Sequence, residues 1–239
     1  MTRRIGLIIP SSNRRVEAEA PRLLPDGVQA HVARLRMTGP HQTSLDALLP
    51  RIAEAAATLA DARCEIIAFH CTATAMEGGP EGEAAIRKAV AEETGTPATS
   101  TATAISGALD GFGARRIGLV TPYDRAMTAG EVGYLTAGGY EVGVAQALDL
   151  GGTDQFCGTE PAFWVETAHR LAGEGHSVDA YVFSCANIRS LEVVDELERT
   201  LGVPVVTSNQ AIFWDCLRRL GVAEPVTGYG RLLREPAAA

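Results

Sequence analysis

Two cysteines stand where a thiol could do chemistry, each directly after an apolar run that is typical of a buried strand. Cys71 follows Ile66–His70, and Cys185 follows Ala180–Ser184. A thiol at a strand-to-helix turn faces the amides of the next helix, which can lower its pKa and raise its thiolate content near neutral pH. Two such thiols suit proton or nucleophile chemistry on both sides of one small carbon centre. We therefore predict that Cys71 and Cys185 are catalytic.

The other three cysteines lack this placement at the end of a strand. Free cysteine is among the most buried residues and commonly only fills space in a core. We assign this packing role to Cys64, Cys157 and Cys216. His70 precedes Cys71, but neighbours along a strand point to opposite faces, so we expect a core or supporting histidine.

Polar side chains follow other predicted strands as well. Ser11, Ser12 and Asn13 come after Ile5–Ile9, and they could grip a carboxylate or cap a helix, where Ser and Asn are preferred. Tyr123 holds the matching place in the second half, where a phenol could donate to a carboxylate or a developing enolate. Ligands of open parallel sheets bind beyond the carboxyl ends of the strands. The same edge also carries Thr72, Ala186 and Asn187.

The sequence contains an internal repeat. Three segments of the first half have similar counterparts in the second half, and the number of residues between the members of each pair is nearly constant. Repetition of strand–helix units in register predicts a duplicated α/β protein with two pseudo-symmetric lobes. The paired segments are Arg3–Pro10 with Arg115–Pro122, Cys64–Ala75 with Val178–Arg189, and Gly95–Ile105 with Gly202–Ile212.

Short continuous apolar runs alternate with helical patterns along the whole chain. Such runs are typical of strands buried on both faces, and the alternation predicts parallel sheets flanked by helices. The predicted strands are Ile5–Ile9, Val28–Leu35, Ile66–His70, Ile117–Thr121, Glu141–Leu148, Ala180–Ser184 and Val203–Thr207. The predicted helices are Leu48–Ala62, Glu81–Glu93, Ala126–Ala137, Pro161–Gly173, Ser190–Leu201 and Gln210–Leu220.

Composition excludes several classes of partner. The chain has 239 residues, of which 46% are hydrophobic, enough for one large or two modest cores. Its net charge of −8 argues against nucleic acid, because phosphate backbones select surfaces rich in Lys and Arg. No apolar run approaches the ~20 residues of a membrane helix, and the short apolar start is no secretory leader. We expect a cytoplasmic protein that binds neither nucleic acid nor membrane.

The spacing of potential ligands gives no sign of a metal or a cofactor. The five cysteines are an odd number without a CxxC pair, which disfavours both a disulfide framework and a zinc site. The five histidines form no HExxH pattern, and neither GxGxxG nor a P-loop occurs. We expect chemistry without metal or cofactor.

Several stretches together resemble the aspartate/glutamate racemase superfamily, and within it the branch of maleate cis-trans isomerases and arylmalonate decarboxylases. These stretches are RIGLIIPSSN, HCTATAM, RRIGLVTPY, FSCANIRSLEVVDELERTLGVPVVTSNQAIFWDCLRRLG and GYGRLL. The resemblance runs from the first strand to Gly230 and implies two flavodoxin-like lobes with an active site in the cleft between them. It implies that residues 1–110 and about 210–239 form the first lobe, and residues 111–209 the second. It also implies a homo-oligomer, a dimer or tetramer.

The resemblance also implies roles for single residues. Cys71 would be the nucleophile or first base, and Cys185 the second acid/base. Asn13, Thr72, Ala73, Tyr123, Ala186 and Asn187 would hold two substrate carboxylates, with Ser11 and Ser12 in the same turn as Asn13. Isomerases of this branch carry an Asn where Gln155 falls here, so we expect Gln155 to contact the substrate.

Cys71 favours an isomerase or a racemase, because the decarboxylases of this branch keep glycine at that place. The PSSN turn and the SCANIR segment favour the maleate isomerase type. We predict a cofactor-independent isomerase of the maleate type, in which a thiolate adds, the bond rotates and the thiolate leaves. A two-cysteine racemase or an arylmalonate-type decarboxylase, each acting on a small carboxylic acid, stays open. A non-catalytic protein that binds small anions is a further alternative, although it has little use for paired thiols.

Overall fold

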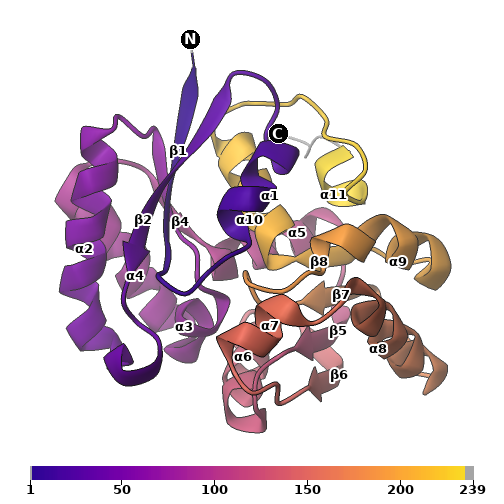
Figure 1. Cartoon of the computed structure of the whole chain (residues 1–239). Helices are drawn as coiled ribbons and strands as arrows, with labels where there is room; N and C mark the ends of the chain where they lie inside the picture. The colour runs from indigo at the N-terminus through magenta and orange to yellow at the C-terminus, as the bar shows by residue number, and fades with distance from the viewer. Residues whose placement is uncertain (1, 235–239) are drawn as a thin grey trace.

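The computed structural model describes residues 2–234, in which two four-stranded parallel sheets carry the fold (Figure 1). The strand orders are β2-β1-β3-β4 and β6-β5-β7-β8, so the second sheet repeats the first with every strand four places later. This repetition confirms the predicted α/β fold with two pseudo-symmetric halves. The strands are β1 Arg3–Pro10, β2 Val28–Leu35, β3 Ile66–Phe69, β4 Ala98–Ser100, β5 Arg116–Thr121, β6 Glu141–Ala147, β7 Ala180–Phe183 and β8 Val205–Thr207.

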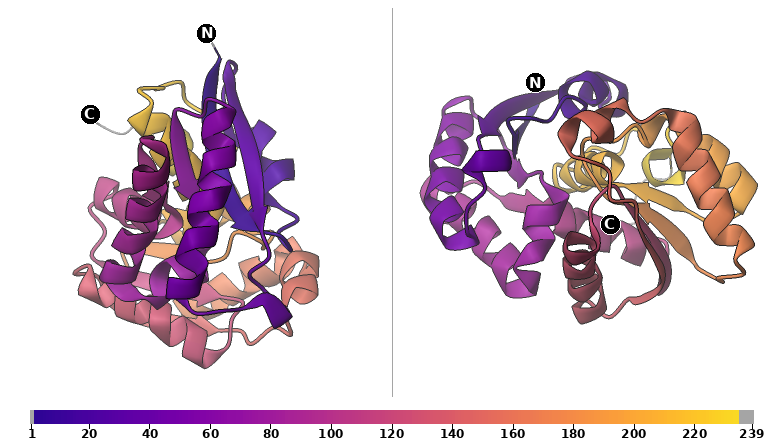
Figure 2. Two further views of the ribbon diagram at one scale, coloured as in Figure 1. Left: turned by 90° about the vertical axis from the view of Figure 1, so that its left-hand side faces the viewer. Right: turned by 60° about the horizontal axis from the view of Figure 1, so that its bottom comes forward.

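Helices flank each sheet, and Figure 2 shows the indigo and purple elements of the first half on one side of the molecule and the orange elements of the second half on the other. The α-helices are α1 Val16–Leu23, α2 Leu45–Asp61, α3 Thr72–Glu77, α4 Gly79–Thr94, α5 Thr101–Gly111, α6 Arg125–Ala137, α7 Thr153–Gly158, α8 Pro161–Gly173, α9 Val194–Leu201, α10 Ser208–Arg219 and α11 Arg231–Arg234. Two 3₁₀ turns, η1 Gly39–His41 and η2 Leu191–Val193, complete the described elements. No helix among residues 2–234 is long and apolar enough to cross a membrane.

All seven predicted strands and all six predicted helices are present, with ends that differ by a few residues. The predictions omitted β4 and the helices α1, α3, α5, α7 and α11. β4 has three residues and α3 has six, which is too short for a recognisable apolar run or helical period. α5 is longer, but its sequence TATAISGALDG is small and apolar on nearly all sides, so it shows no amphipathic pattern.

The third repeated segment builds equivalent corners in the two halves. Gly95 ends α4 and Gly202 ends α9, both with left-handed φ values of 65° and 76° that glycine adopts without steric cost. A three-residue strand follows in each half, and then a helix capped by a hydroxyl. Ser100 accepts from the N–H of residue 103 at the start of α5, and Thr207 accepts from the N–H of residue 210 at the start of α10.

These two capped helices join the halves, because α5 and α10 pack against each other. α10 also contacts α1, β3 and β4 of the first half and β8 of the second. The division into lobes at residues 1–110 with 210–239 and 111–209 stays a prediction, and residues 1 and 235–239 of it lie outside the described residues.

The central strands are buried and end at one place. The side chains of β3 and β7 are wholly buried, whereas the edge strands β2 and β6 are partly exposed. Beyond the carboxyl ends of β1, β3, β5 and β7 lie Ser11, Cys71, Tyr123 and Cys185. The duplicated topology therefore brings the predicted site residues to the edges of two sheets.

Candidate active site

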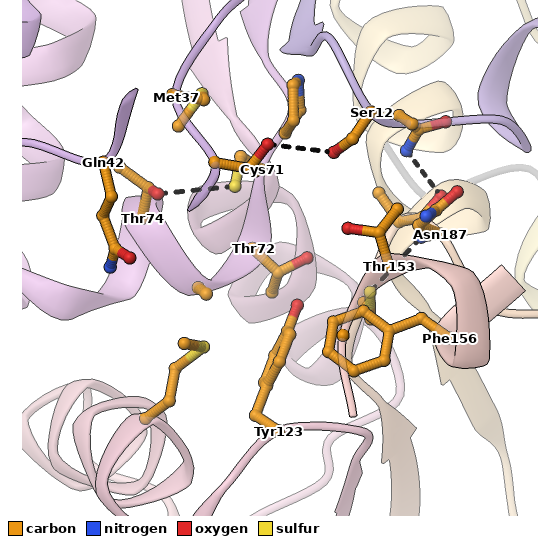
Figure 3. Close-up of a pocket in the computed structure, with 18 of the residues that line it drawn as sticks. Ser12, Met37, Gln42, Cys71, Thr72, Thr74, Tyr123, Thr153, Phe156 and Asn187 are labelled. Atoms are coloured by element: carbon orange, nitrogen blue, oxygen red, sulfur yellow. Dashed lines mark hydrogen bonds between the residues drawn. The ribbon is translucent and has the colours of Figure 1, made fainter. Parts of the chain in front are cut away.

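A cavity of about 230 Å³ lies where the carboxyl ends of the two sheets meet (Figure 3). Both halves contribute to its wall, and nine of the eleven predicted site residues line it. These nine are Ser12, Asn13, Cys71, Thr72, Ala73, Tyr123, Cys185, Ala186 and Asn187. The two predicted catalytic cysteines thus face one space from opposite halves.

The remaining two predicted site residues lie elsewhere. Ser11 is exposed and lines only a shallow hollow beside the cavity, because its backbone pairs with Leu35 and turns its side chain outward. Gln155 is exposed, and its Oε1 accepts from the N–H of Gly151. Residues three apart share a helix face, so Thr153 and Phe156 of α7 reach the cavity while Gln155 points away. Gln155 therefore does not line the cavity, and its contact with the substrate stays a prediction.

Cys71 immediately precedes α3 and is partly exposed. Its thiol donates to the Thr74 hydroxyl across 3.4 Å, and Figure 3 shows this pair on one side of the cavity with Tyr123 and Phe156 on the other. When the thiol ionises, the Thr74 hydroxyl can reverse its role and donate to sulfur. One turn of α3 therefore supplies both the thiol and a donor for its thiolate.

Cys185 follows β7 and is only 7% exposed. Its own N–H donates to the Ser208 hydroxyl at 3.1 Å, and the N–H of Asn187 donates to its sulfur at 3.3 Å. Ser208 in turn bonds to the Thr72 hydroxyl at 2.8 Å. This chain of hydrogen bonds fixes the Cys185 turn against the start of α3, which carries Cys71.

Burial governs the acidity of both thiols. It raises the pKa of Cys71 despite the side-chain and backbone hydrogen bonds from Thr74, and the nearby Glu131 raises it further. Burial raises the pKa of Cys185 to about 12, although Tyr123 and the N–H of Asn187 act in the opposite direction. The prediction that the strand-to-helix turn lowers these pKa values is therefore wrong for the free protein, because desolvation outweighs the local amides.

Tyr123 is a neutral hydrogen-bond donor in this cavity. Burial raises its pKa well above the ordinary value, and its ring packs edge-on against Phe156 with centroids 5.6 Å apart. A phenol that keeps its proton can donate to a carboxylate or an enolate oxygen. Tyr123 therefore fits its predicted role.

Polar contacts hold the two sides of the cavity together. The Asn13 amide donates to the carbonyl of Ala186 at 2.9 Å, and its Oδ1 accepts from the N–H groups of Arg15 and Val16. The Asn187 Oδ1 accepts from the N–H of Arg14 at 2.8 Å. Both predicted asparagines thus shape the cavity wall. The Asn13 amide uses one of its two N–H groups in this way, so the other is available to a substrate carboxylate.

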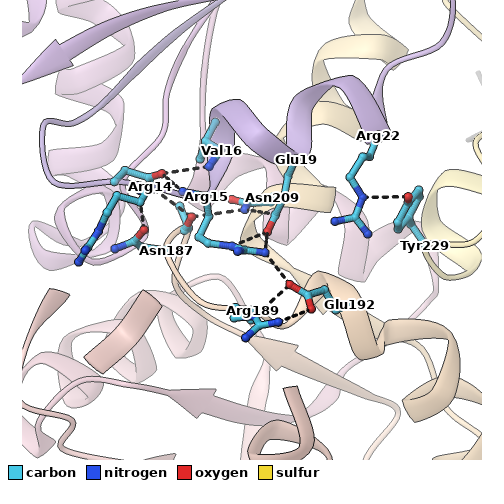
Figure 4. A network of polar contacts seen from close by, with 12 residues as sticks. Arg14, Arg15, Val16, Glu19, Arg22, Asn187, Arg189, Glu192, Asn209 and Tyr229 are labelled. Carbon is cyan, nitrogen blue, oxygen red and sulfur yellow. Dashed lines mark hydrogen bonds and ion pairs between the residues drawn. The ribbon is translucent and has the colours of Figure 1, made fainter. Parts of the chain in front are cut away.

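Figure 4 shows a wider network behind this wall. Arg15 pairs with the buried Glu19 at 3.0 Å and with Glu192 of the second half at 2.6 Å. Asn209 donates to Glu19 at 2.6 Å and bonds to His70 Nε2 at 2.9 Å. Burial lowers the pKa of His70 to about 4, so His70 is neutral and supporting, as expected.

The sequence predictions missed part of the cavity wall. The missed residues come from the end of β1, the loop after β2, the α7 segment after β6, and the helical turns after Cys71 and Tyr123. They are Pro10, Met37, Thr38, Gly39, Gln42, Thr74, Met127, Gly152, Thr153 and Phe156. β2 and β6 end at the same sheet edges, so the rule used for the central strands would have found both segments.

No Lys, Arg or His is among the residues that line the cavity. Hydroxyls, amides and backbone N–H groups would therefore have to bind any carboxylate. The first N–H groups of α3, at residues 72–74, have no acceptor within their own helix. Within residues 2–234, no group of three or more His, Cys, Asp or Glu side chains could hold a metal ion.

Comparison with known proteins identifies this architecture. The family model of arylmalonate decarboxylase matches residues 5–233. The chain belongs to this family. A maleate isomerase of Nocardia farcinica is 35% identical over 99% of this chain and 97% of its own length. An arylmalonate decarboxylase of Bordetella bronchiseptica is 29% identical over 97% of this chain and 96% of its own.

A solved member of the family carries a reaction intermediate. It is the Nocardia farcinica maleate cis-trans isomerase in a Cys-to-Ser variant with a covalently bound succinylcysteine intermediate. Its TM-score to this structure is 0.90 at 32% identity, covering 98% of this chain and 99% of that chain. The resemblance drawn from the sequence is confirmed, and the relatives are enzymes.

Proposed function

We propose that this protein is a cofactor-independent maleate cis-trans isomerase that uses Cys71 and Cys185. The observation that carries the proposal is that two thiols from equivalent strand ends line one small cavity without any cationic side chain in its wall. A relative of 32% identity holds a succinyl group on a cysteine, which is the adduct expected when a thiol adds to maleate.

Cys71 is the nucleophile in this mechanism. It is the more exposed of the two thiols, and Thr74 is placed to donate to its sulfur once the proton has left to solvent. The thiolate adds to one alkene carbon of maleate, so a C–S bond forms and the π electron pair moves toward the far carboxylate. Rotation about the double bond of maleate is too slow, and the covalent adduct replaces it by steps with lower barriers.

Cys185 is the acid and then the base. With a pKa of about 12 it keeps its proton at neutral pH, and it delivers that proton to the second alkene carbon. The central bond is now single and rotates. The Cys185 thiolate then takes a proton back from that carbon, the C–S bond breaks with its electron pair returning to Cys71, and fumarate leaves.

Neutral donors stabilise the negative charge that builds up on the substrate. Tyr123, Thr72 and the N–H groups of residues 72 and 73 surround the cavity, and a preorganised donor in such a site commonly contributes about 10²-fold or more to the rate. Asn187 belongs to the set of residues predicted to hold the two substrate carboxylates.

The direct test is to incubate the purified protein with maleate and to follow fumarate by proton NMR. We expect turnover without added metal or cofactor. If no fumarate forms, and deuterium from the solvent enters a chiral α-substituted acid, the proposed activity would be racemisation and not isomerisation.

Arylmalonate decarboxylation is the second candidate, because Met37, Met127 and Phe156 contribute apolar side chains to the cavity wall and the family model carries that description. Cys185 alone would then protonate the enediolate left by loss of CO₂. Cys71 has no task in that reaction. If a Cys71→Gly variant releases CO₂ from phenylmalonate and the wild type does not, the residue at position 71 decides between the two activities.

The predicted homo-oligomer, a dimer or tetramer, is also part of this proposal. Light scattering of the full chain in solution measures its mass directly, and a mass of one chain would contradict the prediction.

A further inference from the structure

A buried carboxyl group on α6, that of Glu131, forms no hydrogen bond of normal geometry, although the Ser184 hydroxyl lies close enough to affect its pKa. Glu131 is on α6 and is 1% exposed, yet neither of its carboxylate oxygens has a hydrogen-bond partner among residues 2–234. An unpaired carboxylate buried in this way is costly unless it takes up a proton. Glu131 does not line the cavity itself.

Glu131 is electrostatically coupled to the reactive groups of the site. A negative charge on it raises the pKa values of Cys71, Cys185 and Tyr123. Burial raises the pKa of Glu131 to about 8, opposed only by the Ser184 hydroxyl next to Cys185. Ser184 Oγ is itself without a normal hydrogen-bond partner in the described part of the chain.

The neighbouring elements do not supply a countercharge. α6 packs against α3, α4 and β6. On α3, Glu77 is exposed and negative. On α4, Glu83 and Arg87 pair with each other at 2.7 Å, and on β6 Glu141 pairs with Arg116.

The exposed Glu81 and Lys88 of α4, and Asp124 and Arg125 at the start of α6 itself, form no hydrogen bond to Glu131. Among the described residues, Glu131 is thus a buried acid with no cation within hydrogen-bonding reach, and its charge acts on two thiols and a phenol of the cavity.

We propose that Glu131 is a positioning residue that must hold a proton for the site to accept a dicarboxylate and to form the Cys71 thiolate. The proposal rests on the proposed function, because a dianionic substrate is what makes a further negative charge costly. A substrate dianion and the thiolate already bring three negative charges into a cavity with no cationic wall. An ionised Glu131 would add a fourth, whereas its protonated form adds none.

The consequence is that binding of a dicarboxylate takes up a proton near pH 8. The free protein is then half ionised at Glu131, while the complex favours the protonated form, so uptake approaches about half a proton. Affinity should fall by up to about tenfold between pH 7 and pH 9, and this loss should appear in KM and not in kcat. If Glu131 served only in packing, neither the affinity for a dicarboxylate nor the proton uptake would depend on it as pH changes.

Titration calorimetry with succinate tests this inference without any turnover, because succinate has two carboxylates and no double bond. The full-length protein is titrated at pH 8 in two buffers of different ionisation enthalpy, and succinate affinity is measured at pH 7 and pH 9. We expect proton uptake in the wild type and none in Glu131→Gln, whose affinity should change by less than about twofold over this range.

Glu83→Gln is the matched control, since Glu83 is a buried carboxylate on the adjacent α4 that is paired with Arg87. It should keep the proton uptake of the wild type. Succinate binding by the wild type without proton uptake would overturn the role of Glu131 and leave the isomerase proposal intact. Failure of succinate to bind at either pH would instead contradict the dicarboxylate function and the inference built on it.

Discussion

The two halves of the molecule present the same group, a cysteine thiol, from equivalent strand ends, but in different surroundings. Cys71 of the first half is partly exposed and has a side-chain hydroxyl, that of Thr74, as its partner. Cys185 of the second half is 7% exposed and is held through backbone N–H groups and Ser208. Duplication therefore gives two copies of one position, and in the proposed mechanism the difference in burial assigns the nucleophile to one and the acid to the other.

The comparison also shows why a thiol at a strand end is not reactive by placement alone. Both cysteines stand at turns that should favour the thiolate, and burial raises both pKa values. A buried thiol that keeps its proton is a suitable acid. A thiol with a hydroxyl donor and access to the cavity is the better nucleophile.

The largest effect is expected from Cys71→Ser. A serine hydroxyl is a far weaker nucleophile at neutral pH, so isomerisation should fall by about 10⁴-fold or more. Initial rates of fumarate formation measure this loss. If the variant keeps a tenth of the wild-type rate, Cys71 is not the nucleophile.

Cys185→Ser should cost less, about 10²- to 10⁴-fold, because it removes a general acid and base but leaves the attacking group. The rate should fall mainly in kcat. Cys216→Ser is a suitable control, since Cys216 is buried on α10 away from the cavity lining. A larger loss in Cys185→Ser than in Cys71→Ser would reverse the assignment of the two roles.

Thr74→Val tests the hydroxyl that distinguishes the first-half thiol. Loss of a hydrogen bond to a thiolate should raise the pKa of Cys71 and lower kcat/KM by about tenfold to a hundredfold. Rates of iodoacetamide labelling of Cys71 against pH measure the change in acidity. Thr58→Val is the control, because the Thr58 hydroxyl bonds to the carbonyl of Ala55 in its own helix. Unchanged labelling would show that Thr74 does not support the thiolate.

The last prediction concerns the free energy of unfolding. Two buried carboxyl groups, those of Glu131 and Glu83, should change it in opposite directions as pH rises. The pKa of Glu131 is raised to about 8 by burial, so its contribution to stability is lost as pH rises from about 4.5 to 8. The pKa of Glu83 is lowered because hydrogen bonds from Arg87, Ser100 and Thr103 outweigh burial, so its contribution is lost as pH falls below about 4.5.

Urea unfolding at several pH values measures both effects. Glu131→Gln should gain stability relative to the wild type as pH rises from 5 to 8, whereas Glu83→Gln should lose stability at pH 7 and less at pH 4. A Glu131→Gln difference that does not change with pH would show that this carboxyl ionises normally.

Much of the fold was predictable because its signals are local. Continuous apolar runs identified the central strands, and the repeated segments identified the duplication that the strand orders confirm. The rule that ligands lie beyond the carboxyl ends of strands gave nine residues, and all of them except Ser11 line the cavity. Short elements such as β4 and α3 gave no comparable signal.

The errors have physical causes that lie outside local sequence. The exposure of Gln155 depends on which face of α7 meets the cavity, and one residue of helix rotates a side chain by about 100°. The acidity of Cys71 and Cys185 depends on their burial in the folded protein, which no local motif encodes. The isolation of Glu131 likewise depends on three separate elements that pack around α6.

The assignment of the two thiols is tested most directly by trapping the adduct. Cys185→Ser is incubated with maleate, and the protein is analysed by intact mass spectrometry and peptide mapping. We predict a mass increase of one maleic acid per chain, located on Cys71. An unmodified protein, or an adduct on Cys64, Cys157 or Cys216 instead, would contradict nucleophilic addition by Cys71.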